Sequence, residues 1–393
     1  MTTINRAFIN REIISWGRER QGFSVEELAA KVSVKGAMII AWESGDALPT
    51  FQQARKLSRS LRIPFGYLYL SHAPNLDAPL PDLRTVPGTA PVTPSPDLFD
   101  LMNDVLLKQQ WFRDHLEADE TISLPFIDTF KPEDSTEDIT SDIQARFGID
   151  NEMRRGCSSW TAFLTLFVRK VEAERILVMR SGIVGNNVYR KLDVEEFRGF
   201  VVSDDLAPLI FINTRDSVAA RIFTLAHEIA HLWIGVSGVS RSTYDQTPDQ
   251  TSKVNVEEHC DSVAAALLMP KSDFNVRWQT HLPTHENAQS LAAFYRVSTL
   301  AVLRRAHDQE FLEDTEYRSA VADEISQQTA VGGDGGGDFY NNLLAKNGNL
   351  FTTTLMTAVL NQQVSFREAA QLLAVNPSTV MGTARHIFGA GVV

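Results

Sequence analysis

The spacing of hydrophobic residues predicts helices over most of the chain and a few strands near its middle. Apolar residues recur at helical spacing between residues 221 and 234, and again between residues 256 and 269, where Pro270 ends the run. Three short apolar runs are typical of strands: residues 175–179, 200–202 and 209–212. The pattern therefore predicts a central α+β region within a mostly helical chain.

The first 70 residues have the periodicity of five short helices. The pattern places helices at residues 11–20, after Ser24, at 33–43 and at 51–61, and a short fifth helix that Pro64 opens. Ser24 with Glu27 three residues later forms a capping box at the second helix. Together with the pieces SxEELAxxxxV and WExGxxxP, this arrangement resembles the XRE (Cro/repressor-type) helix-turn-helix domain.

The remaining pattern divides the chain further. Prolines gather in residues 73–97, which indicates a semi-rigid linker, and glycines in residues 331–337, which indicates a hinge. Two further stretches, residues 288–298 and 364–379, have the residue pattern of helix-turn-helix pairs. Such pairs more often contribute to packing of the core than to recognition of DNA. The predicted parts are an all-α helix-turn-helix domain (1–72), the linker (73–97), an α+β domain (98–280), a helical subdomain (281–330), the hinge (331–337) and a C-terminal helical subdomain (338–393).

The sequence His227-Glu228-Ile229-Ala230-His231 carries the clearest chemistry. On a helix, positions i and i+4 lie on the same face, so His227 and His231 can bind one metal ion together. Glu228 then lies close enough to act on a water molecule at that metal, which is the arrangement of zinc hydrolases. The alternative is a buried helix whose histidines are satisfied by hydrogen bonds.

A catalytic zinc ion needs a third protein ligand and one open position. Glu257 and Asp261 lie at positions i and i+4 of the next predicted helix, and Glu257 is the expected third ligand. Asp261 is expected to accept the second ring N–H of a zinc-binding histidine. Cys260 is interpreted as a small buried residue, whereas Glu258 and His259 point away from this face.

The residues that stabilise the oxyanion of a peptide-cleaving reaction are not defined by a motif. Such a site needs donors aimed at the oxygen that becomes negative. Tyr189, Tyr244 and His259 are the candidates that the sequence offers.

The HExxH helix and the ExxCDxxAAxLLMP helix together resemble the ImmA/IrrE family of bacterial metallopeptidases. The resemblance extends to residues 192–200 and 207–214 ahead of the HExxH helix, to residues 80–85, and to the tail from residue 336 onward. It implies a zincin-like domain in which His227, His231 and Glu257 bind Zn²⁺ and Glu228 is catalytic. The theme of that family is cleavage of a helix-turn-helix repressor to switch on genes.

Composition is consistent with a cytoplasmic protein. The chain has no apolar run near the roughly 18 residues of a membrane span, and no basic-then-apolar leader, so no membrane association is expected. Its two cysteines form no evident framework, which favours a reducing compartment. The net charge of −12 argues against a protein that coats nucleic acid along its whole length.

The first 70 residues are basic, with ten Lys and Arg against six Asp and Glu, whereas the whole chain is acidic. Lys35, Lys31 and Arg55 are the candidate DNA-binding residues in this part. The third helix should present polar side chains to base edges, but residues 36–41 read Gly-Ala-Met-Ile-Ile-Ala. Two interpretations stay open: DNA binding mainly through phosphates, or a repressor fold used to bind protein.

The function expected from these features is that of a zinc-dependent endopeptidase regulator. Its partner would be a protein substrate, a helix-turn-helix repressor or a toxin-system protein, in a stress, mobile-element or toxin–antitoxin setting. The alternative is a non-proteolytic DNA-binding regulator or antitoxin with a zinc-stabilised, peptidase-like domain. The sequence leaves homo-oligomerisation open.

Overall fold

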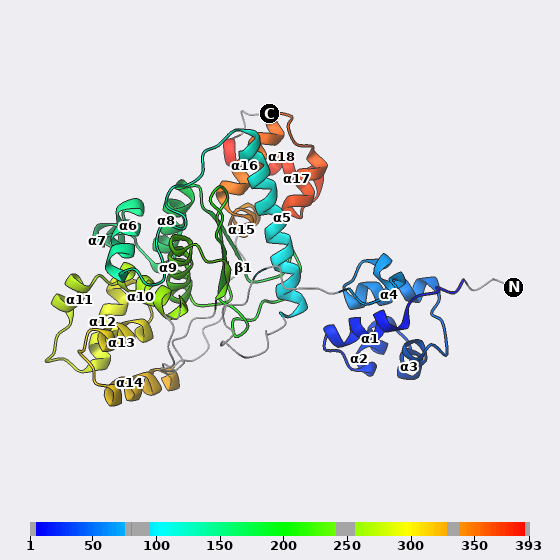
Figure 1. Ribbon diagram of the computed structural model, residues 1–393, viewed down its shortest axis with the longest axis horizontal. Helices are drawn as coiled ribbons and strands as arrows, with labels where there is room; N and C mark the ends of the chain where they lie inside the picture. The colour runs from blue at the N-terminus through cyan, green and yellow to red at the C-terminus, as the bar shows by residue number, and fades with distance from the viewer. Residues whose placement is uncertain (1–4, 75–79, 81–93, 241–255, 328–337, 390–393) are drawn as a thin grey trace. The chain divides into compact units, whose positions relative to one another are not determined.

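The structure is a computed structural model that describes residues 5–74, 80, 94–240, 256–327 and 338–389. The predicted glycine hinge, most of the proline-rich linker and Tyr244 lie outside these residues. The chain divides into two compact units, one formed by residues 1–79 and 93–100 and the other by residues 80–92 and 101–393. Figure 1 labels their helices and strands.

The first unit is entirely helical. Ser24 and Glu27 form the predicted capping box, and Thr50 and Gln53 form a second one ahead of the fourth helix. A buried core that includes Ile14, Leu28 and Trp42 joins the helices. The elements of this unit are α1 (Arg11–Arg20), α2 (Val25–Val32), α3 (Gly36–Ser44), α4 (Phe51–Leu61) and the 3₁₀ helix η1 (Phe65–Tyr69).

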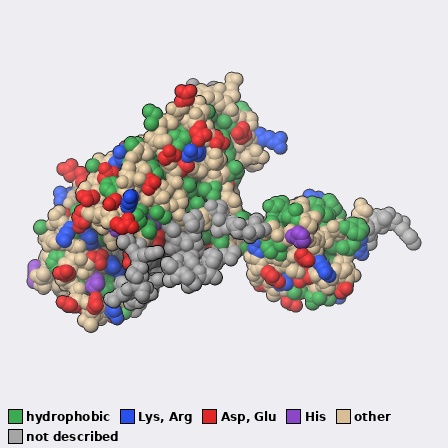
Figure 2. Space-filling model, viewed as in Figure 1, with side chains coloured by type: hydrophobic (Ala, Val, Ile, Leu, Met, Phe, Trp, Pro, Cys, Tyr) green, Lys and Arg blue, Asp and Glu red, His purple; other side chains and the backbone are tan. Residues whose placement is uncertain are grey.

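The third helix begins later than predicted. Ser33 has a left-handed backbone (φ 63°) and ends α2 as its C-cap, so the helix expected from residue 33 starts at Gly36. The intervening residues form the turn between two helices, which is the helix-turn-helix arrangement. Figure 2 shows hydrophobic side chains gathered on the visible face of this unit. The exposed hydrophobic residues of the unit include Phe8, Ile40 and Phe51.

The second unit is built around a four-stranded sheet in the order β1-β3-β2-β4. Strand β3 runs parallel to β1 and antiparallel to β2, and β2 pairs antiparallel with β4. All five residues of β3 are buried, as expected for a strand covered on both faces. The strands are β1 (Leu177–Ser181), β2 (Gly199–Val202), β3 (Leu209–Asn213) and β4 (Gly238–Ser240).

Helices cover the sheet and extend beyond it. Helices α8 and α9 lie along one side of the sheet and α5 along the other (Figure 1). The helices are α5 (Pro96–Ala118, which begins in the first unit), α6 (Thr136–Phe147), α7 (Asn151–Gly156), α8 (Trp160–Ala173), α9 (Val218–Ile234), α10 (Val256–Leu268), α11 (Lys271–Arg277), α12 (Thr284–Tyr295), α13 (Thr299–Asp308), α14 (Asp314–Gln327), α15 (Phe339–Asn347), α16 (Asn349–Leu360), α17 (Phe366–Leu373) and α18 (Pro377–Phe388). The predicted α+β class, with an all-α N-terminal domain and a helical C-terminal region, is confirmed.

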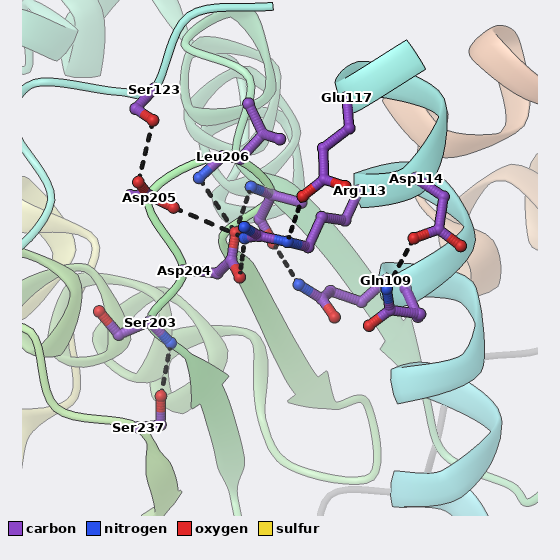
Figure 3. Close-up of polar contacts among 12 residues, drawn as sticks. Gln109, Arg113, Asp114, Glu117, Ser123, Ser203, Asp204, Asp205, Leu206 and Ser237 are labelled. Carbon is purple, nitrogen blue, oxygen red and sulfur yellow. Dashed lines mark hydrogen bonds and ion pairs between the residues drawn. The ribbon is translucent and has the colours of Figure 1, made fainter.

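Polar contacts fasten α5 to the turn between β2 and β3 (Figure 3). Arg113 forms an ion pair with Asp204, and the Gln109 amide donates a hydrogen bond of 3.0 Å to a backbone carbonyl of the same turn. At the end of β2, the Ser203 N–H donates to the Ser237 hydroxyl at 2.7 Å, next to β4. These bonds hold the turn of the hairpin formed by β2 and β3. The opposite end of this hairpin, at Gly199, lies beside the HExxH helix α9.

Candidate metal centre

The HExxH residues lie on α9, a helix with clear signals at both ends. The Ser217 side chain accepts a hydrogen bond from the Ala220 N–H, and Gly235 ends the helix in a left-handed conformation (φ 75°). Every residue from Ile222 to Ile234 is buried. Such a helix is covered on all sides, so its polar side chains must find partners inside the protein.

The two histidines and Glu257 converge on one point. Their candidate ligand atoms, one from each residue, lie within 4.8 Å of one another, and all three residues are buried. The Nε2 atoms of His227 and His231 are 3.0 Å apart, and the Glu257 carboxylate lies 3.4 Å from the first and 3.2 Å from the second. Two imidazole nitrogens and a carboxylate in this arrangement could hold a metal ion.

Asp261 lies one turn beyond Glu257 on α10 and faces the back of the first histidine. Its Oδ1 is 2.8 Å from His227 Nδ1, so the carboxylate accepts the ring N–H when Nδ1 is protonated. This hydrogen bond leaves Nε2 directed toward His231 and Glu257. The two side chains that the sequence was expected to pair thus lie together, and the orienting role of Asp261 stays a prediction.

Burial and neighbouring charges shift the pKa values of this cluster strongly. Burial lowers the pKa of His227, but the carboxylates of Asp261 and Glu257 outweigh it and raise that pKa well above its usual value. Burial raises the pKa of Glu257, but hydrogen bonds from the two histidines reverse the effect and lower that pKa to about 2. The groups that face one another in the cluster thus outweigh the effect of burial on the pKa values of His227 and Glu257.

Glu228 lies against the sheet, next to β2 and β4. The Ser240 hydroxyl of β4 donates to its Oε2 at 3.3 Å, and its Oε1 has no hydrogen-bond partner among the described residues. Complete burial raises the pKa of Glu228 to about 8. Gly199 of β2 makes room for the carboxylate, since a Cβ atom there would lie 2.6 Å from Oε1.

A small cavity opens beside these residues, and several of the residues that line it could not be predicted from the sequence. Arg198 precedes β2 and Ser240 ends β4, so both lie outside the HExxH helix, and β4 is too short to be predicted from hydrophobic pattern alone. The cavity is lined by Arg198, Phe223, Thr224, His227, Glu228 and Ser240.

The structure separates the other candidates from this cavity. Tyr189 is 92 % exposed, and His259 is half-buried on α10 near Asp134; neither lines the cavity. Cys260 is buried and free, as expected for a packing residue. Residues 209–212 lie in β3, which has a strand on each side and is therefore not an edge of the sheet.

The predicted DNA-binding side chains lie on the first unit. Lys31, Lys35 and Arg55 are all exposed, and the Lys31 ammonium lies 4.8 Å from the centre of the Phe23 ring. Lys35 is the N-cap residue of α3. Their exposure leaves them available to phosphates, and their role stays a prediction.

Comparison with known proteins identifies both regions. Residues 176–307 match the family model described as the IrrE N-terminal-like domain, of the M78 peptidases, and residues 14–68 match a helix-turn-helix model. No curated protein matches the chain. Among the described helices, none is both long and apolar enough to cross a membrane. The chain therefore combines an N-terminal region that is similar to helix-turn-helix domains with a region that is similar to the IrrE N-terminal-like domain of the M78 peptidases.

Proposed function

We propose that this chain is a zinc-dependent endopeptidase that regulates gene expression by cleaving a protein partner. The observation that carries the proposal is the convergence of His227, His231 and Glu257 within 4.8 Å, beside the carboxylate of Glu228. The M78 match supports a peptidase, and the helix-turn-helix match supports a link to transcription.

The donor set fits zinc. Two neutral imidazoles and one carboxylate are a set that catalytic zinc uses, and Asp261 supplies the hydrogen bond that orients His227. When bound, a zinc ion would make a water molecule more acidic and polarise the carbonyl of a peptide bond. His227, His231 and Glu257 would hold it.

Glu228 is the residue proposed to transfer protons. Ser240 holds its Oε2, which leaves Oε1 to accept a proton from the attacking water and later deliver it to the leaving amine. Because the carboxylate is buried and lies against Gly199, its position is restricted by packing. A restricted base loses little freedom when the reaction begins.

We further propose a helix-turn-helix repressor or a toxin-system protein as the substrate, in a cytoplasmic stress or mobile-element response. The competing function is a non-proteolytic regulator or antitoxin that keeps the fold and the metal but cleaves nothing. The helix-turn-helix domain favours this second candidate as much as the first.

The first experiment is metal analysis of the purified full chain and two variants. We expect about one zinc per wild-type chain, with loss in Glu257→Ala, because a ligand is removed. Glu258→Ala is the matched control, since Glu258 is the exposed neighbour on α10. Wild-type protein without zinc, purified without chelator, would overturn the proposed metal centre.

The second experiment separates cleavage from binding. Glu228→Gln keeps size and packing but removes the base, so it should retain zinc and lose cleavage. Wild type and variant are incubated with a proteome-derived peptide library, and new amino termini are identified by mass spectrometry. Equal products from both proteins would contradict the role of Glu228. If cells that carry the Glu228→Gln variant show the same change in gene expression as cells with the wild-type protein, the non-proteolytic regulator is favoured.

A further inference from the structure

One local structure occurs three times among the described residues. In each case a left-handed residue ends a helix, a valine follows, and the next residue is the N-cap of a second helix. The left-handed residues are Ser33 (φ 63°), Arg296 (φ 62°) and Ala374 (φ 54°). Each valine N–H donates to an alanine carbonyl five residues earlier: Val34 to Ala29 at 2.9 Å, Val297 to Ala292 at 3.2 Å and Val375 to Ala370 at 2.9 Å.

The second helix of each pair is the one that would enter a DNA groove, and its exposed side chains decide whether it can. In α13, the residues Ala301, Val302, Leu303, Arg305 and Ala306 are buried, so this helix serves packing. In α3, the N-cap residue Lys35 is exposed and can donate hydrogen bonds, but the next exposed positions are Ala37 and Ile40. Neither side chain can donate or accept a hydrogen bond, so neither reads base edges.

Helix α18 presents a different surface. Asn376 and Ser378 at its N-terminal end are exposed and Thr379 is partly exposed, while Arg385 and His386 are exposed two turns later. The opposite face carries the buried Val380, Thr383 and Ala384. Amide, hydroxyl and guanidinium groups are the side chains that recognise base edges in the major groove.

The helices around α18 complete a three-helix arrangement. Helix α16 packs on both α17 and α18, with Phe351, Leu355 and Met356 in its buried face. Ser365 caps α17, and Arg367 is exposed in the first turn. In helix-turn-helix proteins this first helix of the pair crosses the DNA backbone, where an arginine contacts phosphate.

Charge also distinguishes this part of the chain. Residues 338–389 contain three Lys and Arg against two Asp and Glu, although the whole chain carries a net charge of −12. The C-terminal helices therefore largely lack the acidic surface that would repel DNA. Their exposed positions are instead rich in uncharged hydrogen-bonding groups.

We propose that α17 and α18 form a second DNA-binding helix-turn-helix, in which α18 enters the major groove of duplex DNA. Asn376, Ser378 and Thr379 contact base edges, and Arg367 and Arg385 contact phosphates. The N-terminal helix-turn-helix then contributes protein contacts or phosphate contacts, while base reading lies at the other end of the chain. The proposal does not depend on the metal centre.

A matched pair of variants tests the proposal. Ser378→Asp and Ile40→Asp each place one carboxylate on the exposed face of a second helix, α18 and α3 respectively. Both positions are exposed, and an acidic residue in the first turn of α18 is favourable for the helix itself. A carboxylate aimed at DNA repels it, so each variant disables the helix that carries it as a reader.

The full chain and both variants are used to select duplexes from a random-sequence pool at fixed ionic strength. We expect wild type and Ile40→Asp to enrich the same motif and Ser378→Asp to lose it. On the enriched duplex, Ser378→Ala should weaken binding roughly 5- to 100-fold, the range for one lost base contact, with little change on a scrambled duplex. Arg385→Gln should weaken both duplexes alike.

The proposal is overturned if the wild type enriches no motif, which is expected if α18 binds a protein. It is also overturned if both Asp variants still enrich the motif, or if only Ile40→Asp loses it. Loss of the motif in both variants would support base reading by α18 and add α3 as a second reader. Circular dichroism of each variant confirms that the helices are intact.

Discussion

Gly199→Ala tests how closely the sheet packs on the candidate base. A Cβ atom at this position would lie 2.6 Å from Glu228 Oε1, 2.7 Å from Thr224 Cγ2 and 2.9 Å from the Phe211 carbonyl oxygen. Ordinary contacts begin near 3.4 Å, so each neighbour must move by about 0.5 Å or more. One of the three atoms is backbone, which cannot rotate away.

The expected cost follows from this crowding. Overpacking of a filled core costs about 1–3 kcal/mol, and the carboxylate of Glu228 is the neighbour most able to move. We therefore expect a lower unfolding temperature for the second unit and loss of peptide cleavage, with zinc retained. Calorimetry of the full chain resolves the transitions of separate units, and metal analysis gives the zinc content.

Gly156→Ala is the control. Gly156 ends α7, and no atom from beyond its chain neighbours and its own helix backbone lies within 4 Å of the position of its missing Cβ. Alanine in that open position should leave the stability unchanged or raise it by up to about 1 kcal/mol. If Gly199→Ala behaves in the same way as this control, the close packing of β2 on Glu228 is refuted.

Two further predictions concern charged groups. Asp261→Ala removes the acceptor for His227 and should weaken zinc binding roughly 10- to 100-fold in a competition assay with a chelator; unchanged affinity would exclude an orienting role. Burial, together with the charge of Lys108, lowers the pKa of Lys346 from 10.5 to about 8. At pH 7 the charged lysine therefore reduces the free energy of unfolding of the wild type, and this cost disappears as the pH rises from about 8 to 10.5. Lys346→Met should therefore gain more stability over wild type at pH 7 than at pH 10 in urea unfolding, and a pH-independent difference would show that the lysine is not strained by burial.

Local signals made much of the fold predictable. Ser24 and Glu27 fix the start of α2 because both hydrogen bonds of the capping box form within four residues. The run at residues 209–212 predicts a strand because it is short, apolar and unbroken, and β3 forms there. The helical i, i+4 spacing brings His227 and His231 together without any tertiary information.

Long-range packing explains what the sequence could not reveal. Ser33 looks like a helix residue, and only the folded turn requires its left-handed backbone. Ser240 and Gly199 contact Glu228 from strands whose pairing is set by the whole sheet, and nothing near them in the sequence marks that contact. The cavity beside Glu228 is likewise a product of tertiary structure.

Residues Ile222 to Ile234 of α9 are all buried, which affects both the hydrogen exchange of its backbone amides and access to the candidate metal centre. Backbone amides in such a helix exchange with deuterium only when the surrounding unit unfolds, so α9 should be among the slowest-exchanging segments of the chain. A bound metal would slow that exchange further, by the free energy of its binding. Entry and departure of a metal or a substrate would then depend on the elements that flank α9, while the helix that carries the histidines stays rigid.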